Sequence, residues 1–300
     1  PDAATGGARG VFGGGTTPTP VATIDYINIS TTGNAISFGS LTGSYSIRGA
    51  CASSTRGIIG SGETTPAVLN TIQFVTIAST GNAVNFGNLS QARRLSSSSS
   101  NSTRGIFAGG ATPADVNTID YITIASQGVN AQDFGNLTVA KRQTAACSSP
   151  TRGVFAGGYG GSAGVTNTIT FITIATTGNG EYFGDLTVSR SNLSGCSNST
   201  RGLFGGGGPT PVNTIDYITI ATTGNAQDFG DLLYSSGQIG ACSSSTRGVF
   251  AGGYVAPTGT NNINFVTIST TGNATDFGDL TQGRVIKNAG CSDAHGGLGD

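Results

Sequence analysis

Apolar residues along this chain occur in short runs whose spacing is that of β-strands. In the segment NTIDYITIATTGN, residues 213–225, Ile215 and Tyr217 alternate with polar residues, and Ile218 and Ile220 then change phase. Because successive side chains of a strand point to opposite faces, this strand is apolar on both faces. Such a strand belongs in a sheet that is covered on both sides.

The same order of segments recurs throughout the sequence. A run of small residues ending in Cys-Ser (as in 145–149) precedes an Arg-Gly segment that ends in paired glycines (152–158). A long strand like 213–225 and a Phe-Gly-x-Leu segment (273–280) follow. The motifs STRG and TTGN join these segments, and their Gly and Asn supply the positive φ that hairpin turns require. The pattern predicts four antiparallel strands in each repeat.

Six copies of this repeat fill the chain at intervals of 46 to 49 residues. Self-similarity at this period is typical of propellers and solenoids. We therefore predict an all-β, six-bladed β-propeller with four antiparallel strands per blade, as a single domain over 1–300. All fourteen Phe fall at three repeat positions and are assigned to the core. The repeats, numbered 1 to 6 below, begin near Arg9, Arg56, Arg104, Arg152, Arg201 and Arg247.

The two ends of the sequence are complementary. Residues 1–15 contain an Arg-Gly strand without a preceding first strand, and AGCSD, residues 289–293, is a first strand without a second. Pairing them would complete one blade and remove the free edges of an open array. We expect the ring to close in this way.

Composition narrows the functional classes. Charged residues are only 10% of the chain and the formal net charge is −1, which disfavours nucleic acid or an anionic membrane as a partner. The apolar runs are too short to span a bilayer. The N-terminus has no signal-peptide pattern, and a chain that begins at Pro1 is expected to be a processed or truncated piece.

The paired glycines, the aromatic third strand and the aromatic-plus-leucine fourth strand resemble the kelch repeat over the whole chain, except that Phe, as at Phe229, replaces the kelch Trp. The fuller phrases NTIDYITIATTGNAQDFGDL and CSSSTRGVFAGG resemble repeats of virion structural proteins of tailed phages, especially marine cyanophages. The resemblance implies a virion appendage or adhesin, assembled in the host cytoplasm and then extracellular.

We expect no enzymatic activity and no cofactor. A copper radical oxidase of the galactose oxidase type needs two His, whereas this chain has only His295. The repeat arginines occupy equivalent positions, and no irregular carboxylate cluster singles out a glycosidase pocket. Ser is abundant, but no His is placed to act as its base. No Cys and His spacing predicts a metal site.

The cysteines share one repeat position, which Ser99 fills in the remaining copy. Equivalent sites on adjacent blades should lie roughly 10 Å apart, beyond the ~7 Å Cα limit for a disulfide. We predict small buried thiols on the innermost strands, consistent with a reducing cytoplasm during assembly. The five are Cys51, Cys147, Cys196, Cys242 and Cys291.

Strand parity places the STRG and TTGN turns on one face of the molecule and the variable loops on the other. Variable loops on a rigid scaffold are where binding usually occurs, and Tyr with Arg is typical of recognition surfaces. Arg93 and Lys287 also fall on this variable face. The binding residues predicted there are Tyr45, Arg94, Lys141, Arg142, Tyr159, Tyr234, Tyr254 and Arg284.

The six Arg-Gly arginines should lie on the opposite face. Two interpretations remain open: each arginine satisfies backbone carbonyls or a neighbouring blade, or together they form an anion site on the axis. The ring would comprise Arg9, Arg56, Arg104, Arg152, Arg201 and Arg247.

Successive third strands alternate between Asp-Tyr and a pair ending in Phe. The pairs are Asp25-Tyr26, Gln73-Phe74, Asp120-Tyr121, Thr170-Phe171, Asp216-Tyr217 and Asn264-Phe265. This predicts duplication of a two-repeat unit and a pseudo-threefold surface suited to a trimeric fibre or a threefold axis.

The expected function is therefore a structural or receptor-binding propeller of a virion, contacting a host-surface glycan or protein, or another virion protein. A cellular kelch-type protein-interaction module and a glycan-processing enzyme with an unrecognised site remain as alternatives.

Overall fold

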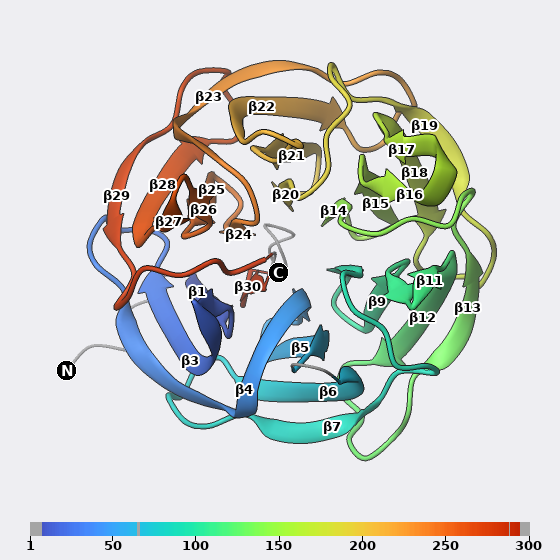
Figure 1. Cartoon of the computed structure of the whole chain (residues 1–300), viewed down its shortest axis with the longest axis horizontal. Coiled ribbons are helices and arrows are strands. Elements are labelled where there is room, and N and C mark those ends of the chain that lie inside the picture. The colour runs from blue at the N-terminus through green and yellow to red at the C-terminus, as the bar shows by residue number, and fades with distance from the viewer. Residues whose placement is uncertain (1–7, 65–66, 288, 295–300) are drawn as a thin grey trace.

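The computed structural model describes residues 8–64, 67–287 and 289–294. Apart from one 3-10 turn, η1 (Gly161–Ala163), the regular elements of this part of the chain are β-strands. Antiparallel sheets surround a central axis in a propeller-like arrangement (Figure 1). The all-β class and the propeller-like arrangement predicted from the repeat are confirmed.

The strands follow the predicted order within each repeat. The strands nearest the axis are the end of β4 (Ile36–Ala52), β8 (Ser97–Ser100), β14 (Ala145–Ser148), β20 (Ser194–Ser197), β24 (Gly240–Ser243) and β30 (Gly290–Ser292). The Arg-Gly strands are β1 (Arg9–Gly13), β5 (Arg56–Glu63), β9 (Arg104–Ala108), β15 (Arg152–Ala156), β21 (Arg201–Gly205) and β25 (Arg247–Ala251). The third strands are β3 (Thr19–Asn28), β6 (Val68–Thr76), β12 (Thr118–Thr123), β18 (Thr168–Thr173), β22 (Val212–Thr219) and β28 (Asn262–Thr267). The outer strands are the start of β4, β7 (Val84–Asn88), β13 (Gln132–Asn136), β19 (Glu181–Asp185), β23 (Gln227–Ser236) and β29 (Thr275–Asp279).

The hydrogen-bonded sheets differ in number from the six separate blades predicted. Four are four-stranded, whereas the strands of the two remaining positions form one eight-stranded sheet that β4 holds together. In the other repeats, a residue with φ near +60° interrupts the extended backbone four residues before the inner cysteine or Ser99, as at Gln143 and Asn192. In repeat 1 the backbone at this place belongs to β4 and pairs with Gly62 of β5. The strand therefore continues through the crossover.

The two ends of the chain pair with each other. β1 and β30 are antiparallel, with Val11 opposite Cys291. The backbone N–H of Arg9 donates to Asp293 Oδ1 at 2.8 Å. The pairing expected from the two half-blades in the sequence is therefore present.

The loops between second and third strands form additional small sheets. β2 (Thr16–Thr17) pairs with β3; the two-stranded sheets are β10 (Ala111–Thr112) with β11 (Ala114–Asp115), β16 (Tyr159–Gly160) with β17 (Gly164–Val165), and β26 (Tyr254–Val255) with β27 (Thr258–Gly259). Single bridges connect these loops to the crossover of the preceding repeat, as between Arg142 and Tyr159. The variable loops are therefore held by neighbouring repeats.

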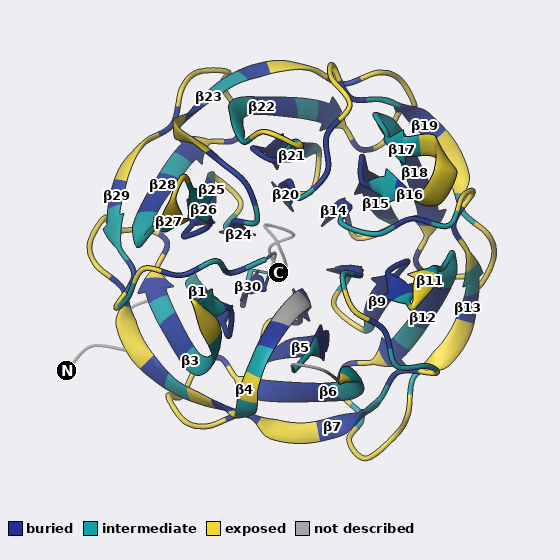
Figure 2. Cartoon of the chain, viewed as in Figure 1, coloured by how far each residue is buried: buried dark blue, intermediate teal, exposed yellow. Residues whose placement is uncertain are grey.

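The core lies between neighbouring sheets. Ile215 and Ile218 of β22, and Ile220 directly after it, are all buried, as expected for a strand apolar on both faces. In every repeat the third-strand aromatic meets the outer-strand Phe edge to face, as Tyr217 meets Phe229 at 6.0 Å between ring centroids. Figure 2 shows burial concentrated on the inner and third strands and exposure on the outer strands and turns.

Small residues allow the inner strands to approach one another. The thiol of each inner-strand cysteine lies against the glycine of an Arg-Gly strand with which its own strand does not pair: a Cβ on Gly202 would lie 2.4 Å from Cys147 Sγ. Serine hydroxyls link successive inner strands, as when Ser197 donates to the Ser148 carbonyl at 2.7 Å. Gly202 has an ordinary φ, so its backbone conformation does not demand glycine. Glycine is required here because there is no room for a side chain.

We predict that Gly202→Ala destabilises the protein by roughly 1–3 kcal/mol, because the new methyl group overpacks the junction against Cys147. Urea denaturation measures the change. Cys147→Ala removes the opposing sulfur, so the double variant should recover much of the loss. Additive effects of the two substitutions would show that the contact does not limit packing here.

Candidate functional site

The Arg-Gly arginines lie between repeats and not in an axial ring. Each guanidinium lies over the third-strand aromatic of its own repeat, and Arg201 is 4.5 Å from the Tyr217 centroid. Each also donates from Nη1 to carbonyls at the end of a neighbouring third strand, as Arg152 does to Ile220 and Ala221. The anion-ring interpretation is therefore wrong, because the side chains are directed to adjacent turns; the carbonyl-binding interpretation is confirmed.

These contacts are made by Arg9, Arg56, Arg104, Arg152, Arg201 and Arg247. The last of them, from Arg247 to the Ile29 carbonyl, joins repeat 6 to repeat 1 at 3.0 Å.

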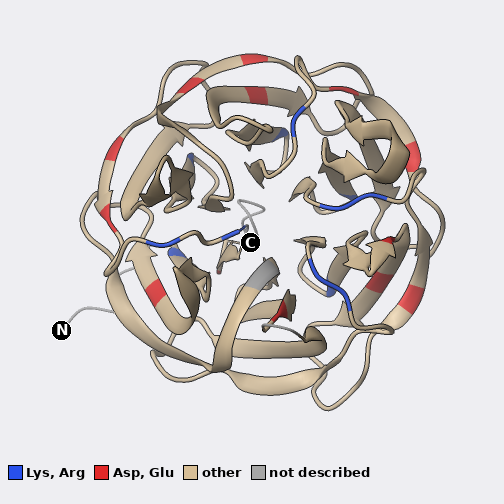
Figure 3. Cartoon of the chain, viewed as in Figure 1, with Lys and Arg blue, Asp and Glu red and all other residues tan. Residues whose placement is uncertain are grey.

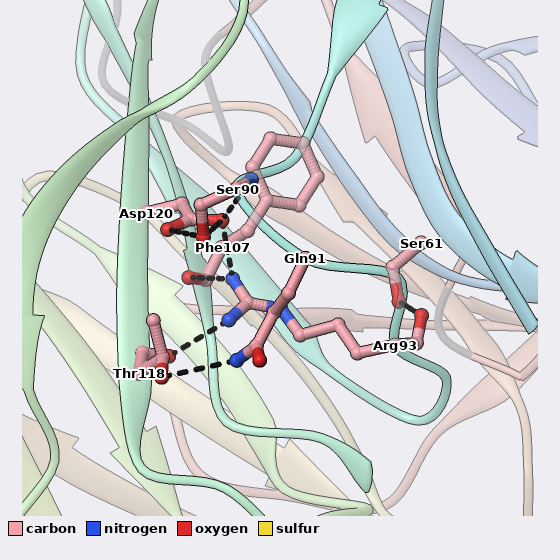
Figure 4. Close-up of polar contacts among 7 residues, drawn as sticks. All are labelled: Ser61, Ser90, Gln91, Arg93, Phe107, Thr118 and Asp120. Atoms are coloured by element: carbon pink, nitrogen blue, oxygen red, sulfur yellow. Dashed lines mark hydrogen bonds and ion pairs between the residues drawn. The ribbon is translucent and has the colours of Figure 1, made fainter. Parts of the chain in front are cut away.

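A buried ion pair connects the crossover of repeat 2 to the third strand of repeat 3. Arg93 and Asp120 are both fully buried, with Nη2 and Oδ2 separated by 3.1 Å. Arg93 also donates to the carbonyls of Phe107 and Thr118, and Ser90 donates to the carboxylate (Figure 4). The charges are thus neutralised inside the protein, and removing one partner would leave an unpaired buried charge.

The same ion pair occurs at two further junctions. Arg190 Nη2 lies 2.7 Å from Asp216 Oδ2, and Arg284 Nη1 lies 2.9 Å from Asp25 Oδ2. Burial lowers the pKa of each of the three guanidiniums, and the facing carboxylate opposes that shift. Even-numbered repeats supply the arginine and odd-numbered repeats the aspartate.

Neutral hydrogen bonds replace the ion pair at the alternate junctions. Thr42 N–H donates to Gln73, the hydroxyls of Thr138 and Thr170 share a hydrogen bond, and Leu233 N–H donates to Asn264. The alternation of Asp-Tyr with Phe therefore accompanies two kinds of buried junction. A pseudo-threefold outer surface stays a prediction.

Three cations assigned to the variable face are in the interior. Arg284 and Arg93 are 0% exposed in the ion pairs above, and Lys141 is 2% exposed. Lys141 Nζ donates to the Thr168 carbonyl at 3.1 Å, and burial lowers its pKa from 10.5 to about 8. The assignments of Arg284 and Lys141 to ligand binding are therefore wrong. Their variable positions suggested exposure, whereas their side chains turn inward between sheets.

The structure brings together two of the predicted surface residues. Arg142 Cζ lies 4.4 Å from the centroid of the Tyr159 ring. Arg142 also forms a salt bridge with Asp115, whose other carboxylate oxygen accepts the Gly161 N–H at 2.7 Å. We call Asp115, Arg142 and Tyr159 the loop cluster. The repeat pattern does not single out Asp115, whose only signal in the sequence is a lone carboxylate in a variable loop.

The other predicted residues are dispersed around the same face. Arg94 is exposed and forms a salt bridge with Glu63 at 2.9 Å. Tyr234 is 48% exposed on β23. Tyr45 and Tyr254 are half-buried, and Tyr254 forms a backbone bridge with Gly237. Lys287 donates to the Ser46 hydroxyl at 2.7 Å.

The axial cavity is narrow and lined by small inner-strand residues, with a volume of about 50 Å³. The five cysteines are buried and unbridged, which confirms the prediction. Burial raises the pKa of all five thiols, in Cys196 and Cys291 to about 12. Within the described residues, no three His, Cys, Asp or Glu side chains are grouped as a metal site. His295 lies outside the described residues.

Besides the charged residues described above, Figure 3 shows basic residues along the radial crossovers and carboxylates on the outer strands of repeats 3 to 6. Asp228 and Asp276 are examples on β23 and β29. Charges on an exposed edge strand oppose pairing with another chain.

No family model matches the chain, and no curated protein matches its sequence. Within the described residues, no helix has the length and apolar character needed to cross a membrane.

We predict that Lys141→Met stabilises the protein at pH 7. The shift of the Lys141 pKa from 10.5 to about 8 corresponds to a burial cost of about 3 kcal/mol. Loss of the Thr168 hydrogen bond offsets about 1 kcal/mol of the gain.

The pH dependence of unfolding separates this effect from packing. Between pH 8 and 10.5 the Lys141 amine binds more protons in the unfolded than in the native state, so this group contributes a rise in stability, whereas the five buried thiols with raised pKa values contribute a fall above about pH 9. Only the difference between the wild type and Lys141→Met isolates the lysine. The advantage of Lys141→Met should disappear over the same interval. A pH-independent difference would contradict the charge explanation.

Proposed function

We propose that the chain is a closed six-bladed propeller that acts as a non-enzymatic binding or structural component of a virion. Closure is supported by the junction between repeats 6 and 1, which repeats the contacts found elsewhere. Gly33 N–H donates to the Phe277 carbonyl at 2.8 Å, as Gly224 does to Phe183. Arg284 pairs with Asp25 just as Arg190 pairs with Asp216.

The proposed closure depends on β30. Truncation after Ala289 removes β30 and leaves the edge of β1 unpaired, so the protein should lose about 2–5 kcal/mol of unfolding free energy and tend to associate. Denaturation and size-exclusion chromatography measure both effects. Truncation after Ala294 keeps β30 and is the matched control. Equal stability of the two truncated proteins would contradict a closed ring.

The variable face is the proposed binding surface, and the loop cluster is the observation that carries this proposal. The Arg-Gly arginines and the buried Arg–Asp pairs recur around the molecule and are engaged within the fold. The loop cluster breaks the sixfold pattern: Asp115 fixes Arg142 beside Tyr159 on the loop face. A rigid Arg–Tyr pair is typical of residues that dominate binding energy.

The partner class follows from the resemblance of the repeats to tailed-phage virion proteins. The proposed partner is a glycan or protein of the host surface, or another virion protein. The carboxylate holding Arg142 fixes the guanidinium while leaving part of it exposed, since the Arg142 side chain is 29% accessible. This arrangement is preorganised for polar recognition.

Binding of the labelled protein to cyanobacterial cells and to a glycan array tests this function. We predict that Arg142→Ala with Tyr159→Ala weakens binding by roughly 30-fold or more, as expected when two central contact residues are lost. Asp276→Ala, on the exposed outer strand β29, is the control and should bind like the wild type.

Thermal denaturation of the variants establishes that folding is retained. Unchanged binding by the double variant would exclude the loop cluster as the contact. Absence of wild-type binding to cells and glycans, together with turnover of a glycan, would favour the enzyme alternative.

A further inference from the structure

A second surface of the molecule has the properties of a ligand site, on the face opposite the variable loops. A pocket of about 280 Å³ opens beside the β22–β23 hairpin of repeat 5. Arg201 pairs with Thr219 at the end of β22, which places the pocket at the TTGN end of the sheet. It is therefore separate from the loop cluster.

The pocket has one cation with unused donor capacity. Arg201 Nη1 donates to the Ile268 carbonyl at 2.9 Å, and its remaining guanidinium N–H groups have no acceptor among the described residues; Arg247 likewise donates to a single carbonyl. No Asp or Glu is among the residues that line the pocket. Within the described part of the chain, Arg201 is therefore positioned to offer free N–H groups to an anionic ligand.

Neutral polar groups surround this guanidinium. The Tyr217 hydroxyl donates to Gln227 Oε1 at 2.6 Å, which orients the amide group. Thr222 and Asn225 of the hairpin turn also line the pocket. A flat aromatic side chain beside hydroxyl and amide groups suits a ligand with both C–H surfaces and hydroxyl groups.

The equivalent place in repeat 3 is much smaller although it has the same Tyr and Gln. Tyr121 and Gln132 line a pocket of only about 60 Å³. The hairpin of repeat 3 has one additional residue, and Val129 replaces Gly224 against the preceding repeat. Val129 is among the residues that line that smaller pocket. Repeat 5 thus combines the Tyr–Gln pair with open space.

We propose that the repeat 5 pocket binds a monosaccharide that carries a carboxylate, either free or at the end of a glycan. Arg201 binds the carboxylate, and Tyr217, Gln227 and the hairpin threonines contact the hydroxyl groups. The volume exceeds that of a simple carboxylate and accommodates one sugar ring. This site does not rest on the binding function of the variable face.

Titration calorimetry or ligand-observed NMR tests the proposal with four probes. Methyl β-glucuronide and N-acetylneuraminic acid provide the carboxylated sugar, methyl β-glucoside the neutral ring, and acetate the carboxylate alone. Saturable binding is expected for at least one acidic sugar, roughly tenfold or more tighter than for methyl glucoside or acetate. A glycan array then distinguishes terminal acidic residues from the free sugar.

Variants assign the binding to this pocket. Arg201→Gln should weaken binding of the acidic sugar by roughly tenfold or more and abolish its preference over the neutral sugar. Tyr217→Phe should weaken it several-fold, and the fold accepts Phe there because Phe74, Phe171 and Phe265 occupy the equivalent place. The matched controls Arg247→Gln and Tyr121→Phe should leave binding unchanged.

Each outcome decides the proposal. No saturable binding by the wild type, equal binding of neutral and acidic sugars, or equal losses in the control variants would overturn it. If Arg201→Gln fails to fold, the wild-type preference among probes and Tyr217→Phe still decide. Arg142→Ala with Tyr159→Ala should retain this sugar binding, so failure of the variable-face function is recognised separately.

Discussion

Each repeat forms a sheet that is apolar on both faces and can bury them only against its neighbours. Ile215 and Ile218 of one third strand are both buried although they belong to opposite phases of the strand. The hydrophobic effect therefore acts mainly between repeats, and stability depends on adjacent sheets being stacked. The remaining features of the molecule make this stacking possible or use the surface that it leaves free.

Stacking has two requirements. The inner strands must approach one another closely near the axis, and buried polar groups farther from the axis must find hydrogen-bond partners. The first is met by size, since Cys147 lies against Gly202 and the inner strands carry Ser, Ala and Gly. The second is met by the crossovers and Arg-Gly arginines, which bond carbonyls of the adjacent repeat. Buried charges such as Arg190 and Asp216 are tolerated because each pair is neutral and hydrogen-bonded.

Regular packing confines variation to two kinds of place. Loops on one face can change because their backbone is fixed by bridges to the preceding crossover, as between Arg142 and Tyr159. Hairpins on the other face can change in length. The hairpin of repeat 3 has one extra residue and a small pocket, whereas the shorter hairpin of repeat 5 has an open pocket. Both candidate sites are therefore local departures from a repeated scaffold, which is where selective recognition can arise without disturbing the core.

The amino-acid sequence by itself determined the strands, their order, the buried thiols and the pairing of the ends, because period, alternation and glycine placement are local signals. It also marked Asp25, Asp120 and Asp216 as a set without revealing their partners. Only the tertiary structure decided that Arg284, Arg93 and Lys141 turn inward, that Asp115 joins Arg142, and that Arg201 retains free donors beside an open pocket. These outcomes depend on which group of a neighbouring sheet each side chain reaches. The position of a residue within its own repeat does not determine its distance from groups in the neighbouring sheet.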